Sequence, residues 1–409
     1  MSTRADMFAL APGFTATATA CGLKPNDALD MALIAADAPC SAAGLFTTNR
    51  VKAAPVIYDQ DVLATNAGSI RAVVINAGNA NACTGPQGAA NCRAMAEMTA
   101  ERLGCRAEQV MVLSTGVIGR QLDMAKVTQG IAALTGPNAQ QGAGAAARAI
   151  MTTDTCPKVA ARTIPVAGKM VTIAGMCKGA GMIHPNMATM LAIVTTDAQA
   201  SPAILDLALR YAADRSFNRV SVDGDTSTND TLLLLASGAS GIPVSDTFAE
   251  DGLAFEQFTA TLTEVCTDLA KQIARDGEGA TRLVEITVSG AQDEQQAHQV
   301  ANAIARSPLV KTAIHGGDPN WGRIVCAAGY SGAAIAPDRL ALWFGPASSP
   351  IQLVANGLPL DADLAAASAL LRQDPVFITL DLGLGAAHTT IWTCDFSKEY
   401  VEINAHYTT

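Results

Sequence analysis

The sequence predicts a layered α/β protein that continues into a smaller α+β domain. Short apolar runs alternate with segments of helical periodicity through most of the chain, which is typical of α/β folds. After Thr281 the strands become separated by shorter connections. The chain has 409 residues, which is enough for two or three domains, each with its own hydrophobic core. Because 49% of the residues are hydrophobic and only 16% are charged, the composition excludes a disordered chain.

Each expected element rests on a local pattern. Apolar runs of five or six residues predict buried strands, and longer segments with apolar residues three or four apart predict helices. Before Thr281 the expected strands are 71–76, 109–114, 170–174 and 190–195, and the expected helices are 88–103, 121–134, 202–216 and 252–275. After it, the expected strands are 283–289, 376–381 and 389–394, and the expected helix is 292–306.

Charge and cysteine content exclude several classes of protein. Lys plus Arg is 27 and Asp plus Glu is 37, so the net charge of −10 argues against a nucleic-acid or anionic-membrane partner. The ten cysteines show no C-x2-C spacing and are too sparse for a disulfide scaffold. No apolar run reaches 18 residues, and the start of the chain does not read as a secretory signal. We expect a cytoplasmic protein with reduced thiols and no metal site.

Several familiar motifs are absent or incomplete. The chain has no G-x-x-x-x-G-K-[ST], H-E-x-x-H or G-x-S-x-G sequence. The loose G-x-G-x-x-A match at 142–147 does not follow a strand, so we interpret it as the first turn of an alanine-rich helix. The acidic segment 223–230 lacks the glutamate that a calcium loop needs at its twelfth position, where Leu234 stands. We expect a structural loop near the site.

The segment 178–192, KGAGMIHPNMATMLA, is the most informative part of the chain. It joins a glycine-rich turn to an expected strand and places small residues around Thr189. A threonine hydroxyl is a weak nucleophile without an adjacent base. Cleavage just before the threonine would supply one, because a free α-amino group titrates at about 7.7–8.0. From the residues alone, Thr189 is either such a nucleophile or simply the start of a strand.

Eight motifs in one order decide between these interpretations. The chain resembles the ornithine acetyltransferase family of arginine biosynthesis, also called bifunctional glutamate N-acetyltransferase/amino-acid acetyltransferase, nearly from end to end. The motifs are NAGNANACTGPQG at 76–88, STGVIG at 114–119, TTDT at 152–155, KGAGMIHPNMATML at 178–191, DGDTSTNDT at 223–231, RDGEGATR at 275–282, GGDPNWGR at 316–323 and YVEINAHYTT at 400–409.

The resemblance implies an α/β layered sandwich of the N-terminal-nucleophile type, α/β/β/α-like, with a smaller C-terminal α+β domain. It implies self-cleavage between Ala188 and Thr189 into an α chain, 1–188, and a β chain. The β chain would complete the catalytic domain with 189–281 and add the smaller domain, 282–409, which ends in a substrate-contacting tail. Two α and two β chains would associate as a heterotetramer.

The resemblance also implies the reaction and its residues. Thr189 would take the acetyl group of N2-acetyl-L-ornithine and pass it to L-glutamate. The implied oxyanion-hole groups are Thr115 and Gly116. The implied substrate-binding residues are Thr152, Lys178, Thr189, Glu278, Asn404 and Thr409. Thr153 adjoins Thr152, so the binding hydroxyl at this position is one of the two.

Three alternatives stay open from the sequence. The enzyme has no expected bound cofactor, but acetyl-CoA is a possible second acetyl donor; without it the enzyme is a monofunctional ornithine acetyltransferase. A related N-terminal-threonine amidase or aminopeptidase would lose the same acyl-threonine to water. A binding protein without catalysis would remain a single uncleaved chain.

Overall fold

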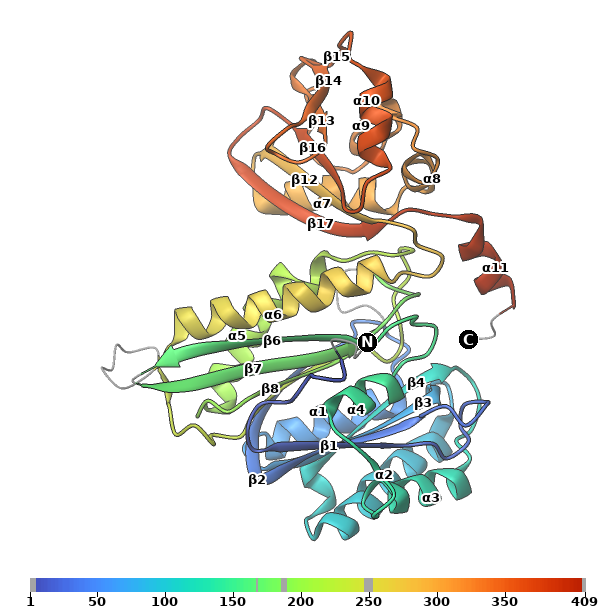
Figure 1. The fold of residues 1–409 in the computed structure, drawn as a ribbon, viewed down its shortest axis with the longest axis vertical. Helices are drawn as coiled ribbons and strands as arrows, with labels where there is room; N and C mark the ends of the chain where they lie inside the picture. The colour runs from blue at the N-terminus through green and yellow to red at the C-terminus, as the bar shows by residue number, and fades with distance from the viewer. Residues whose placement is uncertain (1–4, 167, 185–189, 246–252, 407–409) are drawn as a thin grey trace.

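The computed structural model describes residues 5–166, 168–184, 190–245 and 253–406. Within them the chain forms two bodies of sheet and helix, one above the other in Figure 1. The larger body contains a nine-stranded sheet, and the smaller body contains a six-stranded sheet. The last described helix, α11 (Lys398–His406), runs from the smaller body back toward the larger one.

The larger body contains the first nine strands in the order β4-β3-β2-β9-β8-β7-β6, with β1 beside β2 and β5 beside β1. These strands are β1 (Phe14–Thr19), β2 (Met31–Phe46), β3 (Ile70–Asn79), β4 (Val110–Val117), β5 (Gln140–Gln141), β6 (Lys158–Val166), β7 (Lys169–Lys178), β8 (Leu191–Thr196) and β9 (Thr231–Ala236). Its helices are α1 (Ala54–Asn66), α2 (Gly85–Leu103), α3 (Met124–Leu134), α4 (Ala143–Ala149), α5 (Pro202–Arg215) and α6 (Phe255–Arg275). A short parallel pair, β10 (Val244–Ser245) and β11 (Leu253–Ala254), precedes α6.

The long strand β2 belongs to both halves of the nine-stranded sheet. Its residues 31–36 pair with β1, and most of the same residues pair with β3 on the other side. Its residues 41–46 pair with β9. The register with β3 shifts between Ala35 and Cys40, which is where a strand can bend. The two halves of the sheet are therefore joined through one continuous strand.

Three hydrophobic clusters show that the larger body has four layers. One cluster joins the two halves of the sheet face to face, with Ile75 from one half and Ile193 from the other. The outer face of the β6–β9 half packs on α5 and α6, as Leu234 and Phe258 illustrate. The outer face of the β3–β4 half, including Val112, packs on α2 and α3. This α/β/β/α arrangement confirms the predicted fold class.

The smaller body follows α6. Its sheet order is β15-β14-β13-β16-β12-β17, and one hydrophobic cluster joins the sheet to its helices. The strands are β12 (Leu283–Ala291), β13 (Ala341–Phe344), β14 (Ile351–Ala355), β15 (Leu358–Pro359), β16 (Val376–Asp381) and β17 (Ala387–Cys394). The helices are α7 (Glu294–Arg306), α8 (Pro308–Gly316), α9 (Trp321–Gly329) and α10 (Leu364–Leu371).

The twelve elements expected from sequence patterns all occur in the structure, with ends that differ by a few residues. The alanine-rich segment after Gly142 is helix α4, as predicted. Strands β1, β2, β6, β9, β13 and β14 and helices α1, α8, α9, α10 and α11 are among the elements that were not expected. No helix among the described residues is both long and apolar enough to cross a membrane.

Candidate active site

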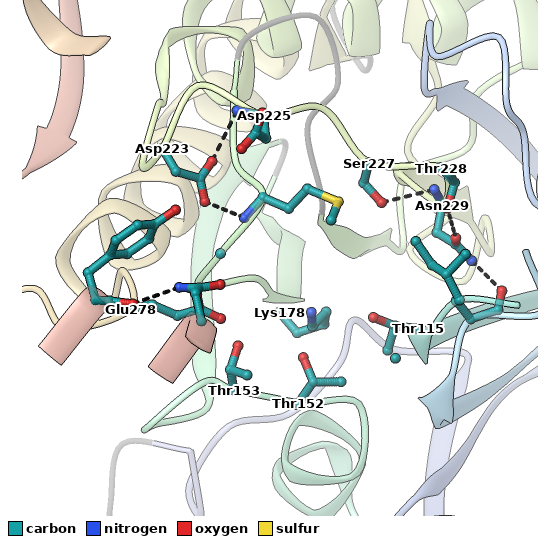
Figure 2. A pocket seen from close by; sticks show the side chains of 17 residues that line it. Thr115, Thr152, Thr153, Lys178, Asp223, Asp225, Ser227, Thr228, Asn229 and Glu278 are labelled. Atoms are coloured by element: carbon teal, nitrogen blue, oxygen red, sulfur yellow. Dashed lines mark hydrogen bonds between the residues drawn. The ribbon is translucent and has the colours of Figure 1, made fainter. Parts of the chain in front are cut away.

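A pocket lies where the ends of several distant segments meet. Strands β4 and β7 end at it, the loop before β9 forms one wall, and α11 closes another. Figure 2 shows Lys178 between Thr115 on one side and Glu278 on the other. The pocket encloses about 120 Å³. For comparison, a cavity of about 150 Å³ holds benzene, so this pocket suits a small molecule. Its lining residues are Ala80, Thr115, Gly116, Ile118, Thr152, Thr153, Lys178, Gly181, Met182, Asp223, Asp225, Ser227, Thr228, Asn229, Glu278, Tyr400 and Asn404.

The predicted oxyanion pair lies at the end of β4. Thr115 is buried, and Gly116 has a φ of +130°, a conformation open mainly to glycine. A Cβ atom at Gly116 would lie 2.3 Å from the carbonyl carbon of Gly78 on the parallel strand β3. The amide of Asn229 supports this wall by donating to the carbonyl of Ser114 at 2.8 Å. Glycine is therefore required at position 116 by both backbone conformation and space.

Lys178, the last residue of β7, is only 3% exposed and lines the pocket. Among the described residues its one ion-pair contact is long, 4.0 Å from Nζ to Oδ2 of Asp154. Burial lowers the pKa of Lys178, Asp154 opposes this effect, and Lys158 adds to it. A buried ammonium group with so little compensation favours an anionic ligand.

Behind Lys178 lies a buried charge cluster of Lys158, Asp154 and Asp276. The Nζ of Lys158 lies 2.6 Å from Oδ1 of Asp154 and 2.5 Å from Oδ2 of Asp276. Burial alone would raise the pKa of Asp154, but Lys158, Lys178 and hydrogen bonds hold it below its usual value. The N–H of Gly179 donates to Asp154 at 2.6 Å, so the cluster also fixes the backbone beside Lys178.

The sequence motifs do not point to Lys158, although it supports the site. The available signal was a lysine directly before Val159 and Ala160, two apolar residues that are buried, because a buried charge needs a partner. Its partners lie four residues before it and 118 residues after it, a separation that no local pattern reveals.

Glu278 lies opposite Lys178, in the loop after α6. Its backbone N–H donates to the carbonyl of Ala180 at 2.8 Å. A Cβ atom at Gly181 would lie 2.4 Å from the Glu278 carboxyl group, so the glycine makes room for this side chain. The amide of Asn404 on α11 donates to Oε2 at 2.8 Å. The C-terminal helix thus holds the carboxylate at the pocket.

Thr152 and Thr153 both line the pocket, and their hydroxyl groups point toward the space around Lys178 in Figure 2. The N–H of Thr152 donates to Oδ2 of Asp154 at 3.0 Å, which connects this turn to the buried charge cluster. Either hydroxyl can therefore reach a ligand in the pocket.

The acidic loop before β9 lies at the pocket, as expected. The Asp223 carboxyl accepts from the N–H groups of Met182 at 2.5 Å and Ile183 at 3.0 Å. Burial raises the pKa of Asp223 to about 6, against the effect of these hydrogen bonds. Asp225 lines the pocket beside it. This loop therefore anchors the glycine-rich segment that follows Lys178.

Of the predicted site residues, the structure brings six together at this pocket: Thr115, Gly116, Thr152, Lys178, Glu278 and Asn404. Ala188, Thr189 and Thr409 lie outside the described residues. The next described residue is Met190, whose N–H donates to the buried carboxyl of Asp230. The pocket collects hydroxyl groups, one cation and several carboxyl groups, a set that can bind a small zwitterion and assist acyl transfer.

The fold and the pocket together define a layered α/β enzyme that acts on a small charged molecule. The ArgJ family model matches residues 15–409, and the chain belongs to this family. It is an acetyltransferase of arginine biosynthesis, in agreement with the motif resemblance.

Curated relatives are similar over nearly their whole length. The arginine biosynthesis bifunctional protein ArgJ of Symbiobacterium thermophilum is 48% identical over 399 residues, which cover 97% of each chain. The protein of the same name from Thermotoga neapolitana is 46% identical over 398 residues, covering 97% of this chain and 99% of its own.

Solved structures of similar proteins cover about half of the chain each. The ArgJ crystal structure from Bacillus halodurans is 42% identical with a TM-score of 0.49, covering 53% of this chain and 98% of its own. The Mycobacterium tuberculosis ornithine acetyltransferase complexed with ornithine is 38% identical with a TM-score of 0.39, covering 46% of this chain and 98% of its own.

Proposed function

We propose that this enzyme transfers the acetyl group of N2-acetyl-L-ornithine to L-glutamate through an acetyl ester on Thr189. The observation that carries the proposal is the pairing of opposite charges across one pocket, with Lys178 on one side and Glu278 on the other. Acetylornithine carries an α-carboxylate and a side-chain ammonium group, which this arrangement matches.

The proposed reaction has two half-reactions. The α-amino group of Thr189 takes the proton of its own hydroxyl while the oxygen attacks the acetyl carbonyl carbon. The carbon–nitrogen bond to ornithine then breaks, and the proton passes to the departing amine. The free amine of glutamate next attacks the threonine ester, and the hydroxyl regains a proton as acetylglutamate leaves. The acetyl group is conserved throughout.

The hydroxyl of Thr115 and the N–H of Gly116 are proposed to stabilise the negative oxygen of each tetrahedral intermediate. One such donor contributes about 3–4 kcal/mol to transition-state stability. The strict need for glycine at 116 supports this role, because a side chain there would displace the backbone N–H. The same two donors would serve the self-cleavage between Ala188 and Thr189, since it also passes through a tetrahedral carbon.

Substrate recognition is proposed to follow the charges of the pocket. Lys178 would pair with the α-carboxylate shared by acetylornithine and glutamate. Glu278, held by Asn404, would receive the side-chain ammonium of ornithine. Thr152 or Thr153 and the C-terminal Thr409 would complete the contacts.

The remaining parts of the proposal concern the wider reaction. We infer that acetyl-CoA is a second acetyl donor, which would make glutamate acetylation possible without acetylornithine; no cofactor need stay bound. The α and β chains are proposed to assemble as a heterotetramer of two each in the cytoplasm.

The deciding experiment incubates the purified protein with acetylornithine, with and without glutamate. We expect ornithine release to become continuous only when glutamate is present, with one acetylglutamate formed per ornithine. Ornithine released at the same rate without glutamate would show a hydrolase instead. A parallel incubation of glutamate with acetyl-CoA tests the second donor.

Denaturing electrophoresis tests self-cleavage directly. We expect the wild type to separate into two chains and the Thr189→Ala protein to remain one inactive chain. A Thr189→Ala protein that still transfers acetyl groups would refute the nucleophile.

A further inference from the structure

A single buried lysine joins the supports of the two charged side chains that face each other across the pocket. The Nζ of Lys158 lies 2.6 Å from the carboxyl group of Asp154 and 2.5 Å from that of Asp276. The side chains of Lys158 and Asp154 have no exposed area, and that of Asp276 is only 7% exposed. Buried charges whose hydrogen bonds are satisfied fix the geometry of the segments that carry them.

The Asp154 side of this cluster reaches Lys178. Strands β6 and β7 are antiparallel neighbours with Lys158 opposite Cys177, so Lys158 begins its strand where Lys178 ends the next one. Oδ1 of Asp154 accepts from the N–H of Gly179 at 2.6 Å, and Oδ2 lies 4.0 Å from Nζ of Lys178. The backbone beside Lys178 and its ammonium group are therefore both located relative to Asp154.

The Asp276 side of the cluster reaches Glu278, two residues further along the chain. Glycines stand on both sides of Glu278, so the backbone of this loop has wide conformational freedom and its position depends on anchors. Asp276 is held by Lys158 and by Thr155, whose N–H donates to Oδ2 at 3.0 Å and whose hydroxyl donates to Oδ1. Glu278 itself is held by Asn404 and by a backbone hydrogen bond.

We propose that Asp276 is a positioning residue that sets the specificity for the acetyl donor. Through Lys158 it fixes the distance between Lys178 and Glu278, which selects a donor whose ammonium group stands three methylenes from the α-carbon. This inference deepens the proposed function and rests on it, because it takes Lys178 and Glu278 as the partners of the donor's carboxylate and ammonium groups.

Selection by length requires a wall that does not move. One methylene more or fewer shifts the ammonium group of the donor by about 1 Å. A misplacement of this size costs about a hundredfold in rate when the site cannot adjust. A mobile Glu278 would follow the longer or shorter side chain, and the penalty would be small. When Glu278 is held through Asp276, the wrong donor leaves a buried carboxylate without its partner.

The test measures kcat/KM for three acetyl donors with glutamate as the acceptor. They are N2-acetyl-L-ornithine, N2-acetyl-L-lysine with one methylene more, and N2-acetyl-L-2,4-diaminobutyrate with one fewer. We expect the wild type to prefer acetylornithine at least about tenfold over each of the others. In Asp276→Ala, we expect this preference to fall at least about threefold.

This readout separates positioning from a purely structural role. Lys158 keeps Asp154 as its partner in Asp276→Ala, so the substitution leaves no buried charge alone. A general loss of folded enzyme would lower kcat/KM for all three donors by one factor and leave their ratios unchanged. Ratios in Asp276→Ala equal to those of the wild type would overturn the proposal.

Asp268→Ala is the matched control, because it breaks another ion pair between the same two elements. Asp268 on α6 lies 2.6 Å from Arg162 on β6, about two helical turns before Asp276, and both residues lie outside the pocket lining. We expect this variant to keep the donor ratios of the wild type. A change in the ratios as large as that of Asp276→Ala would show that loosening β6 from α6 is enough, against the proposal.

Asp276→Asn decides the question if the alanine variant does not fold. The amide keeps one acceptor oxygen and replaces the other with an NH2 group, so we expect a smaller fall in the preference, and an unchanged preference would then overturn the proposal. A wild type that uses all three donors equally would overturn it as well. A wild type that transfers acetyl groups from none of them would instead refute the proposed function.

Discussion

Two fully buried lysines, one in each body of the molecule, are accommodated by opposite means. Lys158 in the larger body lies between the carboxyl groups of Asp154 and Asp276. Burial alone would lower its pKa, but the two carboxylates outweigh burial and raise it. Lys158 therefore stays protonated, and it belongs to a network of charges that reaches the pocket.

Lys311 on α8 of the smaller body has no carboxylate within ion-pair distance among the described residues. It donates to the hydroxyl of Thr393 at 2.8 Å and to the carbonyl of Cys394, and it lies 4.5 Å from the ring centre of Phe396. Burial lowers the pKa of Lys311, with an opposing effect from Cys394. The two lysines therefore differ in their partners: Lys158 pairs with carboxylates in a network that reaches the pocket, whereas Lys311 donates to neutral oxygens.

Removing the charge of Lys158 should have the largest effect. Lys158→Met leaves two carboxyl groups buried without their cation, so we expect a loss of about 3–5 kcal/mol in the free energy of unfolding. Urea titration measures the loss, with Lys169→Met at the exposed start of β7 as the control. A loss below about 1 kcal/mol would show that the two carboxyl groups simply become neutral.

Lys178→Met should separate function from stability. The pKa of Lys178 is lowered by burial, so we expect its removal to change the free energy of unfolding by less than about 1 kcal/mol. Loss of the charge for the substrate carboxylate should lower kcat/KM about a hundredfold. Steady-state kinetics with acetylornithine measure kcat/KM. A loss of threefold or less would exclude Lys178 as the residue that binds the substrate carboxylate.

Lys311→Met should lower the free energy of unfolding by less than Lys158→Met does, and it should leave catalysis unchanged. The hydroxyl of Thr393 and the carbonyl of Cys394 lose a donor, and we expect a cost of about 1–2 kcal/mol. Equal losses for the two lysine variants in urea would show that the carboxylate partners of Lys158 make no difference to stability. KM and kcat should stay at their wild-type values.

The smallest effect is in the pH dependence of stability. The pKa of Lys311 in the folded protein lies below its usual value of 10.5. The charged side chain therefore destabilises the fold fully at pH values below the folded pKa, and this destabilisation disappears as the pH rises toward 10.5. Lys158 has a raised pKa, so its contribution stays full below 10.5 and is lost only above it.

From about pH 7 to about pH 10, the wild type should therefore gain stability relative to Lys311→Met. It should gain nothing relative to Lys158→Met over the same range. Urea titrations at several pH values measure both differences. A stability difference between wild type and Lys311→Met that is constant with pH would show that Lys311 keeps an ordinary pKa.

Sequence patterns predicted many of the elements with apolar runs or helical periodicity, but they missed the fully buried strand β9. Strand 376–381 and helix 202–216 were predicted almost to the residue. Strand β2 was missed because it is rich in alanine, which has a low β propensity. Strand β6 was missed because Lys158 and Arg162 interrupt its apolar residues, and their partners Asp276 and Asp268 lie more than 100 residues away in the sequence.

The site was predictable for a different reason. The predicted residues that meet at the pocket, from Thr115 to Asn404, were identified from the family resemblance and not from local sequence patterns. Asp230 and the charge cluster around Lys158 depend on contacts between distant segments that no spacing rule predicts. Both belong to the support of the pocket, which only the folded structure makes visible.

The strand order of the larger body has a practical consequence. Strands β8 and β9, which follow the proposed cleavage point, lie between β2 and β7, which precede it. The two products would therefore be interleaved within one hydrogen-bonded sheet and could separate only by melting it. Gel filtration should never release a free half under native conditions, and calorimetry should show the halves melting in the same transition. Halves expressed in separate cells and then mixed should fail to regain activity unless they are unfolded together first.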